Sequence, residues 1–225
     1  LHSNADVRAE NISYNKTQAT FTLIHKGAEL GTILLQVPGE HNILNSLGAA
    51  CIGIELGLVS HDIIQGLNKY NGVRRRFEIK GTINDILVVD DYAHHPTEVK
   101  ATLKAANDGW DRRIISIFQP HLFTRTRDFF MEFANAFLNS DVLIITEIYP
   151  AREEPIKGIT GELVAKAAEN AGHKNVLFIP DLEDLNKQLD LIAQPGDMVL
   201  TMGAGTIWRY SDKYFSHLKN VEAAA

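Results

Sequence analysis

Apolar and polar residues follow two different periods along this chain, and the change from one to the other predicts its elements. Over the first forty residues the period is two, as in a β-strand. It is clearest over residues 19–25 and 31–37, with Gly27 between them as a turn. From residue 40 to 57 apolar residues recur at helical spacing, and a second helix is expected from Ser60, its N-cap, to about Tyr70. The first part of the chain is therefore predicted to combine strands with two helices.

Beyond Gly81 the pattern becomes regular, because short apolar runs alternate with segments of helical period. We predict strands at residues 86–89, 114–118, 142–146, 176–179 and 198–201. We predict helices at residues 96–107, about 127–138, 161–171, 182–192 and about 206–218. This alternation is typical of βαβ units, so the predicted fold class is α/β with a mostly parallel sheet. We place a domain boundary near Lys80, which gives domains at 1–80 and 81–222.

Composition and charge narrow the class of protein. With 45% hydrophobic and 22% charged residues, the chain has the composition of a soluble globular protein. A formal net charge of −6 argues against a nucleic-acid partner, and no apolar run approaches the length of a membrane span. The single cysteine, Cys51, lies in an apolar helical pattern, and we expect a buried structural thiol. We expect a cytoplasmic protein with no membrane partner.

Both ends of the sequence suggest a piece of a longer chain. The first residue is Leu1 rather than a methionine, and residues 223–225 are three alanines that resemble a vector scar. We expect the chain to be a fragment, and residues 223–225 are left out of the fold prediction.

The segment at residues 90–98 carries the densest chemistry. It holds two carboxylates, a phenol and two imidazoles between a predicted strand and a predicted helix. In an open α/β sheet, ligands bind at the carboxyl ends of the strands. Pro96 suits a first helical position, so His94 and His95 precede a helix N-terminus, which favours an anion such as phosphate. The alternative is a capped helix with exposed histidines, and the spacing matches no zinc pattern, so no metal ligand is assigned.

A second polar segment follows the next predicted strand. It contains His121, Arg125 and Arg127, which should rise at the same edge of the sheet as His94. Two arginines suit a carboxylate or phosphate that is held bidentately. By contrast, we interpret residues 152–154 as a solvated loop and residues 203–205 as a tight strand-to-helix turn.

Two further segments leave alternatives open. His41, Asn42 and Asn45 open the first helix, and the two amides suit a purine or a phosphate. The alternative is that Asn42 merely caps the helix and His41 is a surface residue. The three arginines at residues 74–76 form a solvated turn, or the arginine just before the next strand holds a nucleotide phosphate or stacks on a base. The chain has no P-loop of the type Gly-x-x-x-x-Gly-Lys-Ser/Thr.

In this order, these motifs resemble those of the Mur ligases of bacterial peptidoglycan synthesis. The matching stretches are residues 39–42, 75–77, 90–98, 119–127 and 196–205. The resemblance implies that residues 1–80 are the later part of the family's central ATP-binding α/β domain. It also implies that residues 81–222 are its Rossmann-like C-terminal domain, with the P-loop and the UDP-substrate domain upstream. One departure is Leu122, where several relatives carry arginine.

The resemblance also implies roles for individual residues. The expected contacts of ATP are His41, Asn42, Asn45, Arg76, Asp91 and Tyr92. The expected catalytic residues are His94, beside the γ-phosphate or acyl phosphate, and His121 with Arg125, which orient the carboxylate of the incoming amino acid. ATP and Mg²⁺ are the expected cofactors, with the magnesium ligands lying upstream.

The activity implied is the ATP-dependent joining of L-alanine to the carboxylate of UDP-N-acetylmuramate through an acyl phosphate. The partners are then these two substrates and the upstream domains of the same chain, in the bacterial cytoplasm. This fragment should be inactive alone. Two alternatives remain: a recycling ligase that adds a murein tripeptide to the same nucleotide sugar, and a non-catalytic nucleotide-binding module.

Overall fold

The computed structural model describes residues 4–224, which form two compact units. Among the described residues, one unit comprises 4–73 with Lys104–Asp111, and the other comprises Arg74–Leu103 with 112–224. Lys80, where the sequence placed a boundary, lies inside a strand of the second unit. The assignment of the two segments to functional domains stays a prediction.

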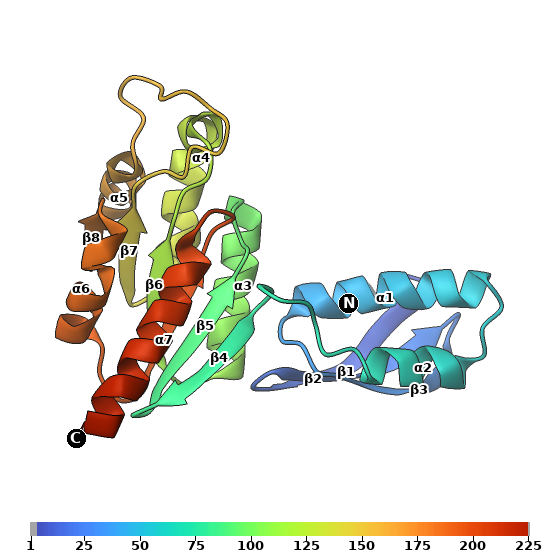
Figure 1. Cartoon of the computed structure of the whole chain (residues 1–225). Coiled ribbons are helices and arrows are strands. Elements are labelled where there is room, and N and C mark those ends of the chain that lie inside the picture. Colours follow the sequence, from blue (N-terminus) through green and yellow to red (C-terminus); the bar gives the residue numbers. More distant parts are fainter. Residues whose placement is uncertain (1–3, 225) are drawn as a thin grey trace. The chain divides into compact units, whose positions relative to one another are not determined.

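The first unit is a small antiparallel sheet with two helices packed on it (Figure 1). Its strands are β1 (Val7–Asn15), β2 (Gln18–His25) and β3 (Ala28–Leu35), in that order across the sheet. The helices are α1 (Glu40–Glu55) and α2 (Ser60–Asn68). Alternate residues of the strands and one stripe of each helix form a shared apolar core, as the two periods of the sequence require.

The second unit is a six-stranded sheet between two layers of helices. The strands lie in the order β4-β5-β9-β6-β7-β8, and β4 alone is antiparallel to its neighbour. The strands are β4 (Glu78–Ile83), β5 (Ile86–Asp91), β6 (Arg113–Phe118), β7 (Val142–Thr146), β8 (Val176–Ile179) and β9 (Asp197–Met202). The helices are α3 (Pro96–Gly109), α4 (Phe123–Ala136), α5 (Gly161–Asn170), α6 (Leu185–Ile192) and α7 (Ile207–Ala224), with 3₁₀ turns η1 (Phe137–Asn139) and η2 (Leu182–Asp184). The predicted α/β class with a mostly parallel sheet is confirmed.

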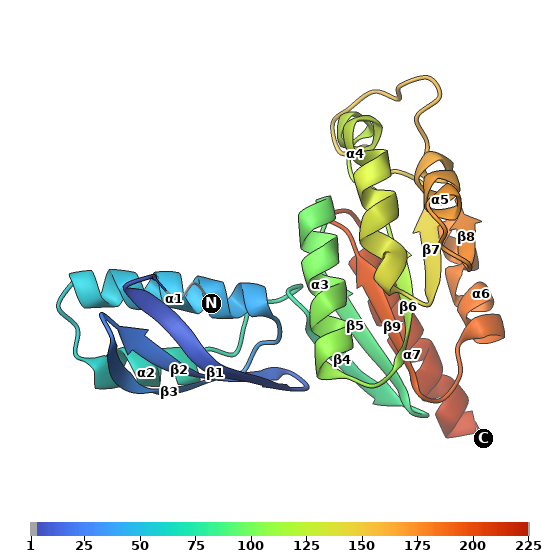
Figure 2. The same ribbon diagram turned by 180° about the vertical axis from the view of Figure 1, so that it is seen from behind.

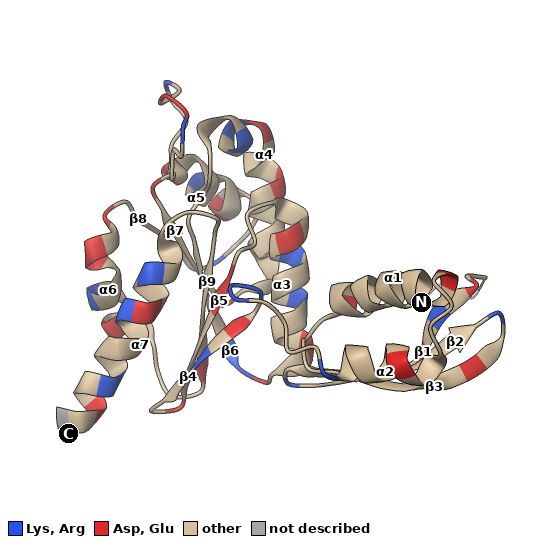
Figure 3. Ribbon diagram, turned by 45° about the vertical axis from the view of Figure 1, so that its right-hand side comes forward, with Lys and Arg blue, Asp and Glu red and all other residues tan. Residues whose placement is uncertain are grey.

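The helical layers explain why the central strands are continuous apolar runs. Helices α6 and α7 cover one face, and α3, α4 and α5 cover the other (Figures 1 and 2). Every residue of β5, β7 and β9 is buried, because each strand is covered on both faces. The charged residues of the second unit lie mostly on its helices and loops, at strand ends and on the edge strand β4 (Figure 3). Among residues 4–224 there is no helix with the length and apolar character needed to cross a bilayer.

Several boundaries differ from the sequence prediction. Helix α4 begins at Phe123 rather than near Arg127, and β5 continues through Asp91 because its last two residues still pair with β9. Ser60 is the first helical residue of α2, and Val59 takes the N-cap position. The expected helix over 182–192 is split into η2 and α6, and α7 extends to Ala224. The expectation of a fragment depends partly on Leu1, and that of a vector scar partly on Ala225. Both residues lie outside the described residues.

The expectation for the cysteine was wrong. Cys51 is exposed in α1, because the helix turns Ile43, Leu47 and Ala50 toward the sheet and leaves its neighbour Cys51 outside the buried stripe.

Candidate active site

The second unit brings two separate motifs together at the carboxyl ends of β5 and β6, which we call the carboxyl edge. The rings of His94 and His121 meet edge to face, with centroids 6.1 Å apart. Arg125, in the first turn of α4, places a guanidinium nitrogen 3.4 Å from Nδ1 of His121. All three residues proposed as catalytic therefore lie side by side, although 27 positions separate the two histidines in the sequence.

Asp91 ends β5 as a buried carboxylate, only 5% exposed. Its Oδ1 accepts the Ala93 N–H and its Oδ2 accepts the Phe77 N–H, both at 2.7 Å. Burial raises the pKa of Asp91 to about 6, against the opposing effect of these two hydrogen bonds. The Asp91 carboxylate thus fixes the backbone at Phe77, before β4, and at Ala93, after β5.

Tyr92 follows, and two guanidinium groups lie close to its ring. The Cζ atoms of Arg75 and Arg76 lie 4.9 and 5.5 Å from the ring centroid, within the range of cation–π attraction. The same ring contacts His94 edge-on at 5.0 Å. The sequence prediction assigned Arg76 and Tyr92 to one ligand, and the two side chains are neighbours here.

Glu98 organises the loop that carries His94. Its Oε2 accepts the His94 N–H at 2.9 Å and the His95 N–H at 3.2 Å, so the third residue of α3 reaches back over the helix N-terminus. Although burial opposes it, the His94 N–H lowers the pKa of Glu98, which keeps this carboxyl ionised. The Arg76 guanidinium lies 3.7 Å from Oε1 of Glu98.

His121 is held from the side by Tyr149. The two rings stack with centroids 5.7 Å apart, and the backbones of the two residues form a parallel bridge. Burial, together with the positive charge of Arg125, lowers the pKa of His121, so its imidazole is neutral at pH 7. Between His121 and α4, Leu122 adopts a φ of 73°, a conformation that is costly for a side-chain-bearing residue and concentrates at functional sites.

The loop after β7 is bound to the edge, contrary to our interpretation of residues 152–154 as a solvated loop. Glu153 accepts hydrogen bonds from the backbone N–H and from the hydroxyl of Thr124, at the N-terminus of α4. An acidic side chain at this position satisfies helix N–H groups that would otherwise lack partners. Only the exposed Arg152 and Glu154 fit the solvated description.

Gln119, which opens one of the matching stretches but was assigned no role from the sequence, supports the turn at residues 203–205. Gln119 is 4% exposed, and its Oε1 accepts the N–H groups of Thr206 and Ile207 at the start of α7. A Cβ on Gly205 would lie 2.4 Å from that oxygen and 2.7 Å from Tyr149. The glycine is therefore needed for close approach, which agrees with the predicted strand-to-helix turn.

Two neighbouring side chains make contacts outside the cluster. The ring of His95 packs on Phe129 of α4 at 5.0 Å, and the exposed Arg127 pairs with Asp128 at 2.7 Å. Helix α4 starts four residues earlier than predicted, so the exposed Arg127 lies in its second turn, and its place at the edge stays a prediction.

His41, Asn42 and Asn45 belong to the first unit, at the start of α1. Asn42 donates from Nδ2 to the Pro38 carbonyl at 2.7 Å, and Asn45 is exposed. Gly39 precedes the helix with a φ of 91° and no side-chain cap. Their expected contact with ATP stays a prediction.

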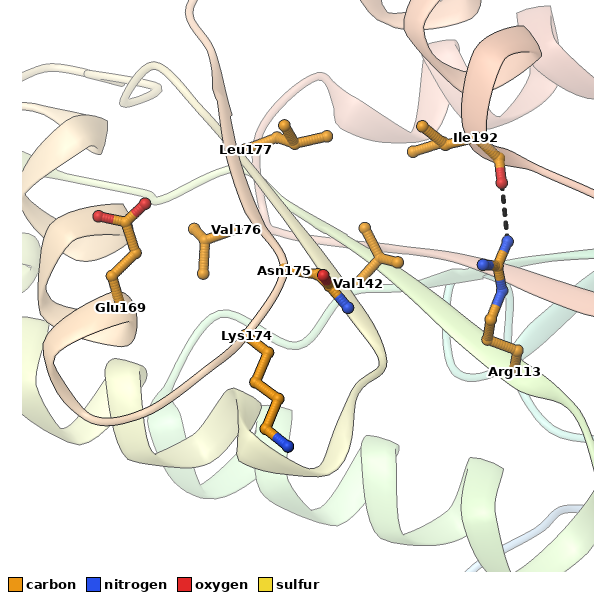
Figure 4. A pocket seen from close by; sticks show the side chains of 8 residues that line it. All are labelled: Arg113, Val142, Glu169, Lys174, Asn175, Val176, Leu177 and Ile192. Atoms are coloured by element: carbon orange, nitrogen blue, oxygen red, sulfur yellow. Dashed lines mark hydrogen bonds between the residues drawn. The ribbon is translucent and has the colours of Figure 1, made fainter.

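A groove at the amino ends of β6, β7 and β8 is a separate feature (Figure 4). Arg113, its most prominent cation, donates to the Ile192 carbonyl at 2.7 Å and is paired with Asp197 at 2.7 Å. Because these groups already satisfy the guanidinium, we do not count the groove as part of the site.

The fold and the carboxyl edge define a Rossmann-like α/β domain with imidazole and guanidinium groups where its parallel strands end. A family model, described as the Mur ligase, glutamate ligase domain, matches residues 75–205. The chain belongs to the Mur ligase family.

Individual relatives agree with this assignment. The chain is 47% identical to the UDP-N-acetylmuramate–L-alanine ligase of Salinibacter ruber, over 96% of this chain and 46% of that protein. It is 44% identical to the ligase of the same name from Geotalea uraniireducens, over 97% of this chain and 48% of that protein. The solved UDP-N-acetylmuramate–alanine ligase MurC of Thermotoga maritima matches with a TM-score of 0.83 at 26% identity, covering 98% of this chain and 47% of that chain. The chain thus spans about half the length of the curated relatives it matches.

Proposed function

We propose that the complete protein is an ATP-dependent ligase that joins L-alanine to the carboxylate of UDP-N-acetylmuramate in bacterial peptidoglycan synthesis. The observation that carries the proposal is the cluster of His94, His121 and Arg125 at the carboxyl edge. The names of the relatives support the choice of substrates.

The proposed chemistry proceeds in two steps. The muramate carboxylate attacks the γ-phosphorus of ATP, and ADP leaves with the electrons of the broken P–O bond. The amine of L-alanine then attacks the acyl carbon, and the tetrahedral intermediate releases phosphate as the amine proton is lost. Positioning and electrostatic stabilisation of the transferred phosphoryl group supply most of the catalysis.

Each residue at the edge suits one part of this scheme. The Arg125 guanidinium would hold the carboxylate of L-alanine bidentately, with the neutral His121 beside it. His94 would face the acyl phosphate from the N-terminal end of α3, where the helix dipole favours an anion. In the same proposal Arg76, Asp91 and Tyr92 contact ATP.

Magnesium would neutralise phosphate charge when bound. Within residues 4–224 no group of three or more His, Cys, Asp or Glu side chains is placed to hold a metal ion. We therefore assign no magnesium ligand among these described residues and derive no step through the metal.

The test is phosphate release by the complete protein with ATP, Mg²⁺ and UDP-N-acetylmuramate, offered L-alanine, glycine, L-serine or the murein tripeptide in turn. Release that depends on L-alanine supports the proposal. Release only with the tripeptide would assign the recycling reaction, and no release with any acceptor would favour a non-catalytic module. The 225-residue chain alone should release none, and robust turnover by it would contradict the proposed need for upstream domains.

A pair of variants on α4 sharpens the assay. Arg125→Met should raise the KM for L-alanine about tenfold or more, because a charge-assisted carboxylate contact is lost. Arg127→Met removes an exposed guanidinium two positions away and serves as the matched control. Equal effects of the two variants would remove Arg125 from the proposed amino-acid site.

A further inference from the structure

Two adjacent arginines, Arg75 and Arg76, have different environments. The Arg75 side chain is 20% exposed; its Nε donates to Asp90 at 3.1 Å and its Nη2 donates to the Gly203 carbonyl at 2.6 Å. The Arg76 side chain is 50% exposed, and its guanidinium lies 3.7 Å from Glu98. One cation is bound within the protein, while its neighbour keeps exposed donors for a ligand.

Arg75 also lies at the centre of a strained turn. Its φ is 61° and that of Phe77 is 47°, both in the left-handed region that side-chain-bearing residues avoid. The turn is fixed by bonds to the end of β5: the Arg75 carbonyl accepts the Tyr92 N–H and the Phe77 N–H donates to Asp91, both at 2.7 Å. Such conformations persist only where the surroundings determine them.

The partner of Arg75 is a fully buried carboxylate. Asp90 is 0% exposed and also accepts a hydrogen bond from the Thr201 hydroxyl at 2.8 Å. Arg75 therefore connects three segments that are distant in sequence: its own turn, the end of β5 and the β9–α7 turn at Gly203. Its guanidinium also lies over the Tyr92 ring.

We propose that Arg75 is a positioning residue that fixes the turn so that Arg76 and Tyr92 are held in place for ATP. The proposal rests on the proposed function for the identity of the ligand. Arg75 itself does not contact substrate; it acts through the backbone of residues 75–77 and through the Tyr92 ring.

The decisive variant is Arg75→Met combined with Asp90→Asn in the complete protein. The second change removes the buried charge that Arg75 neutralises, and an asparagine can still accept the Thr201 bond. We expect this double variant to remain folded while its KM for ATP rises about tenfold or more, because small misplacements at a reacting centre are costly. The KM for L-alanine should stay unchanged, since His121 and Arg125 rest on β6 and α4. Arg74→Met, at an exposed neighbouring arginine, is the matched control and should leave both constants unchanged.

A purely structural role predicts a different result. If Arg75 only neutralises Asp90, the double variant should have wild-type KM values for both substrates, and that outcome would overturn the proposal. If the double variant does not fold, Arg75→Lys decides: a lysine can reach one of the two acceptors but not span both. Arg75→Lys should be folded with a raised KM for ATP, and wild-type kinetics for it would likewise refute the proposal.

A measurement without substrates separates this proposal from the proposed function. Turnover of the unmodified protein tests the proposed function, independently of the variants. The imidazole NMR signals of His94 report the position of the Tyr92 ring, 5.0 Å away. They should shift in Arg75→Met/Asp90→Asn and not in Arg74→Met. Signals that stay in place would overturn the positioning role whether or not the enzyme turns over.

Discussion

Asp91 offers a quantitative test of how burial and hydrogen bonding compete at the carboxyl edge. The variant to compare with the parent is Asp91→Asn in the 225-residue chain. The folded chain holds a pKa of about 6 for this carboxyl, against 3.8 for the unperturbed group. Between these values the folded chain keeps a proton that the unfolded chain has lost. The free energy of unfolding therefore falls as pH rises through this window and is lowest above it.

The size of the effect follows from the width of the window. A separation of about 2 pKa units corresponds to about 3 kcal/mol at about 1.4 kcal/mol per unit. The stability contributed by the neutral acid is fully present below pH 3.8 and is lost as pH rises through about 6. Asparagine cannot titrate, so the free energy of unfolding of the Asp91→Asn variant lacks this dependence on pH. Its amide oxygen replaces only one of the two carboxylate oxygens, so the N–H of Phe77 or Ala93 loses its hydrogen bond to residue 91, which costs about 1–3 kcal/mol at every pH.

Urea unfolding is measured at several pH values from about pH 4 to pH 7, with the fluorescence of Trp208 as the signal. Trp110 is replaced by Phe in both the parent and the Asp91→Asn variant, so that Trp208 is the one tryptophan left. The free energy of unfolding of the parent minus that of Asp91→Asn should fall by roughly 2 kcal/mol over this range. Asp111→Asn, at an exposed carboxylate, is the matched control. A difference that stays constant, or that grows with pH, would show that the two backbone hydrogen bonds outweigh burial and that the reasoning is wrong.

Two further predictions concern buried groups near the edge, and both are measured by the same urea unfolding. Thr201→Val should cost about 1–3 kcal/mol because it removes a donor to a buried carboxylate of β5, whereas Ser116→Ala should cost nothing, since its buried hydroxyl makes no hydrogen bond within residues 4–224. Equal losses of unfolding free energy in Thr201→Val and Ser116→Ala would contradict the role assigned to the Thr201 hydrogen bond. Gly205→Ala should destabilise the chain by about 1–3 kcal/mol and displace Tyr149, because the added Cβ overlaps its ring. Gly66→Ala, in an open position of α2, should stabilise by about 0.5–1 kcal/mol, and a Gly205→Ala chain as stable as Gly66→Ala would refute the contact.

The sheet could be predicted from the sequence because its strands are short apolar runs bounded by polar turns. The expected strands at 142–146 and 176–179 coincide with β7 and β8. Strands that are covered on both faces can be recognised without knowing their partners, since most of their positions are apolar. The meeting of His94 and His121 also followed from a general property of parallel sheets, that strand ends share one edge.

What could not be predicted depends on contacts between distant residues. The early start of α4 follows the backbone bridge of His121 to Tyr149, and Glu153 reaches Thr124 across 29 positions. No local period carries that information. Similarly, three consecutive arginines look alike in sequence, yet Arg75 differs because one of its acceptors lies 128 residues away.

The polar groups of the carboxyl edge divide into two classes by what their hydrogen-bonding atoms contact. Asp90 and Gln119 are almost fully buried, and the protein itself supplies donors to both side chains. Arg76 and His94 keep exposed surface, and the backbone that carries them is held by bonds to Asp91 and Glu98. A buried charge without its partner is costly, so the first class fixes the geometry and leaves little freedom to the second. Substitutions in the buried class should therefore change where a ligand sits, whereas substitutions in the exposed class should change how strongly it is held.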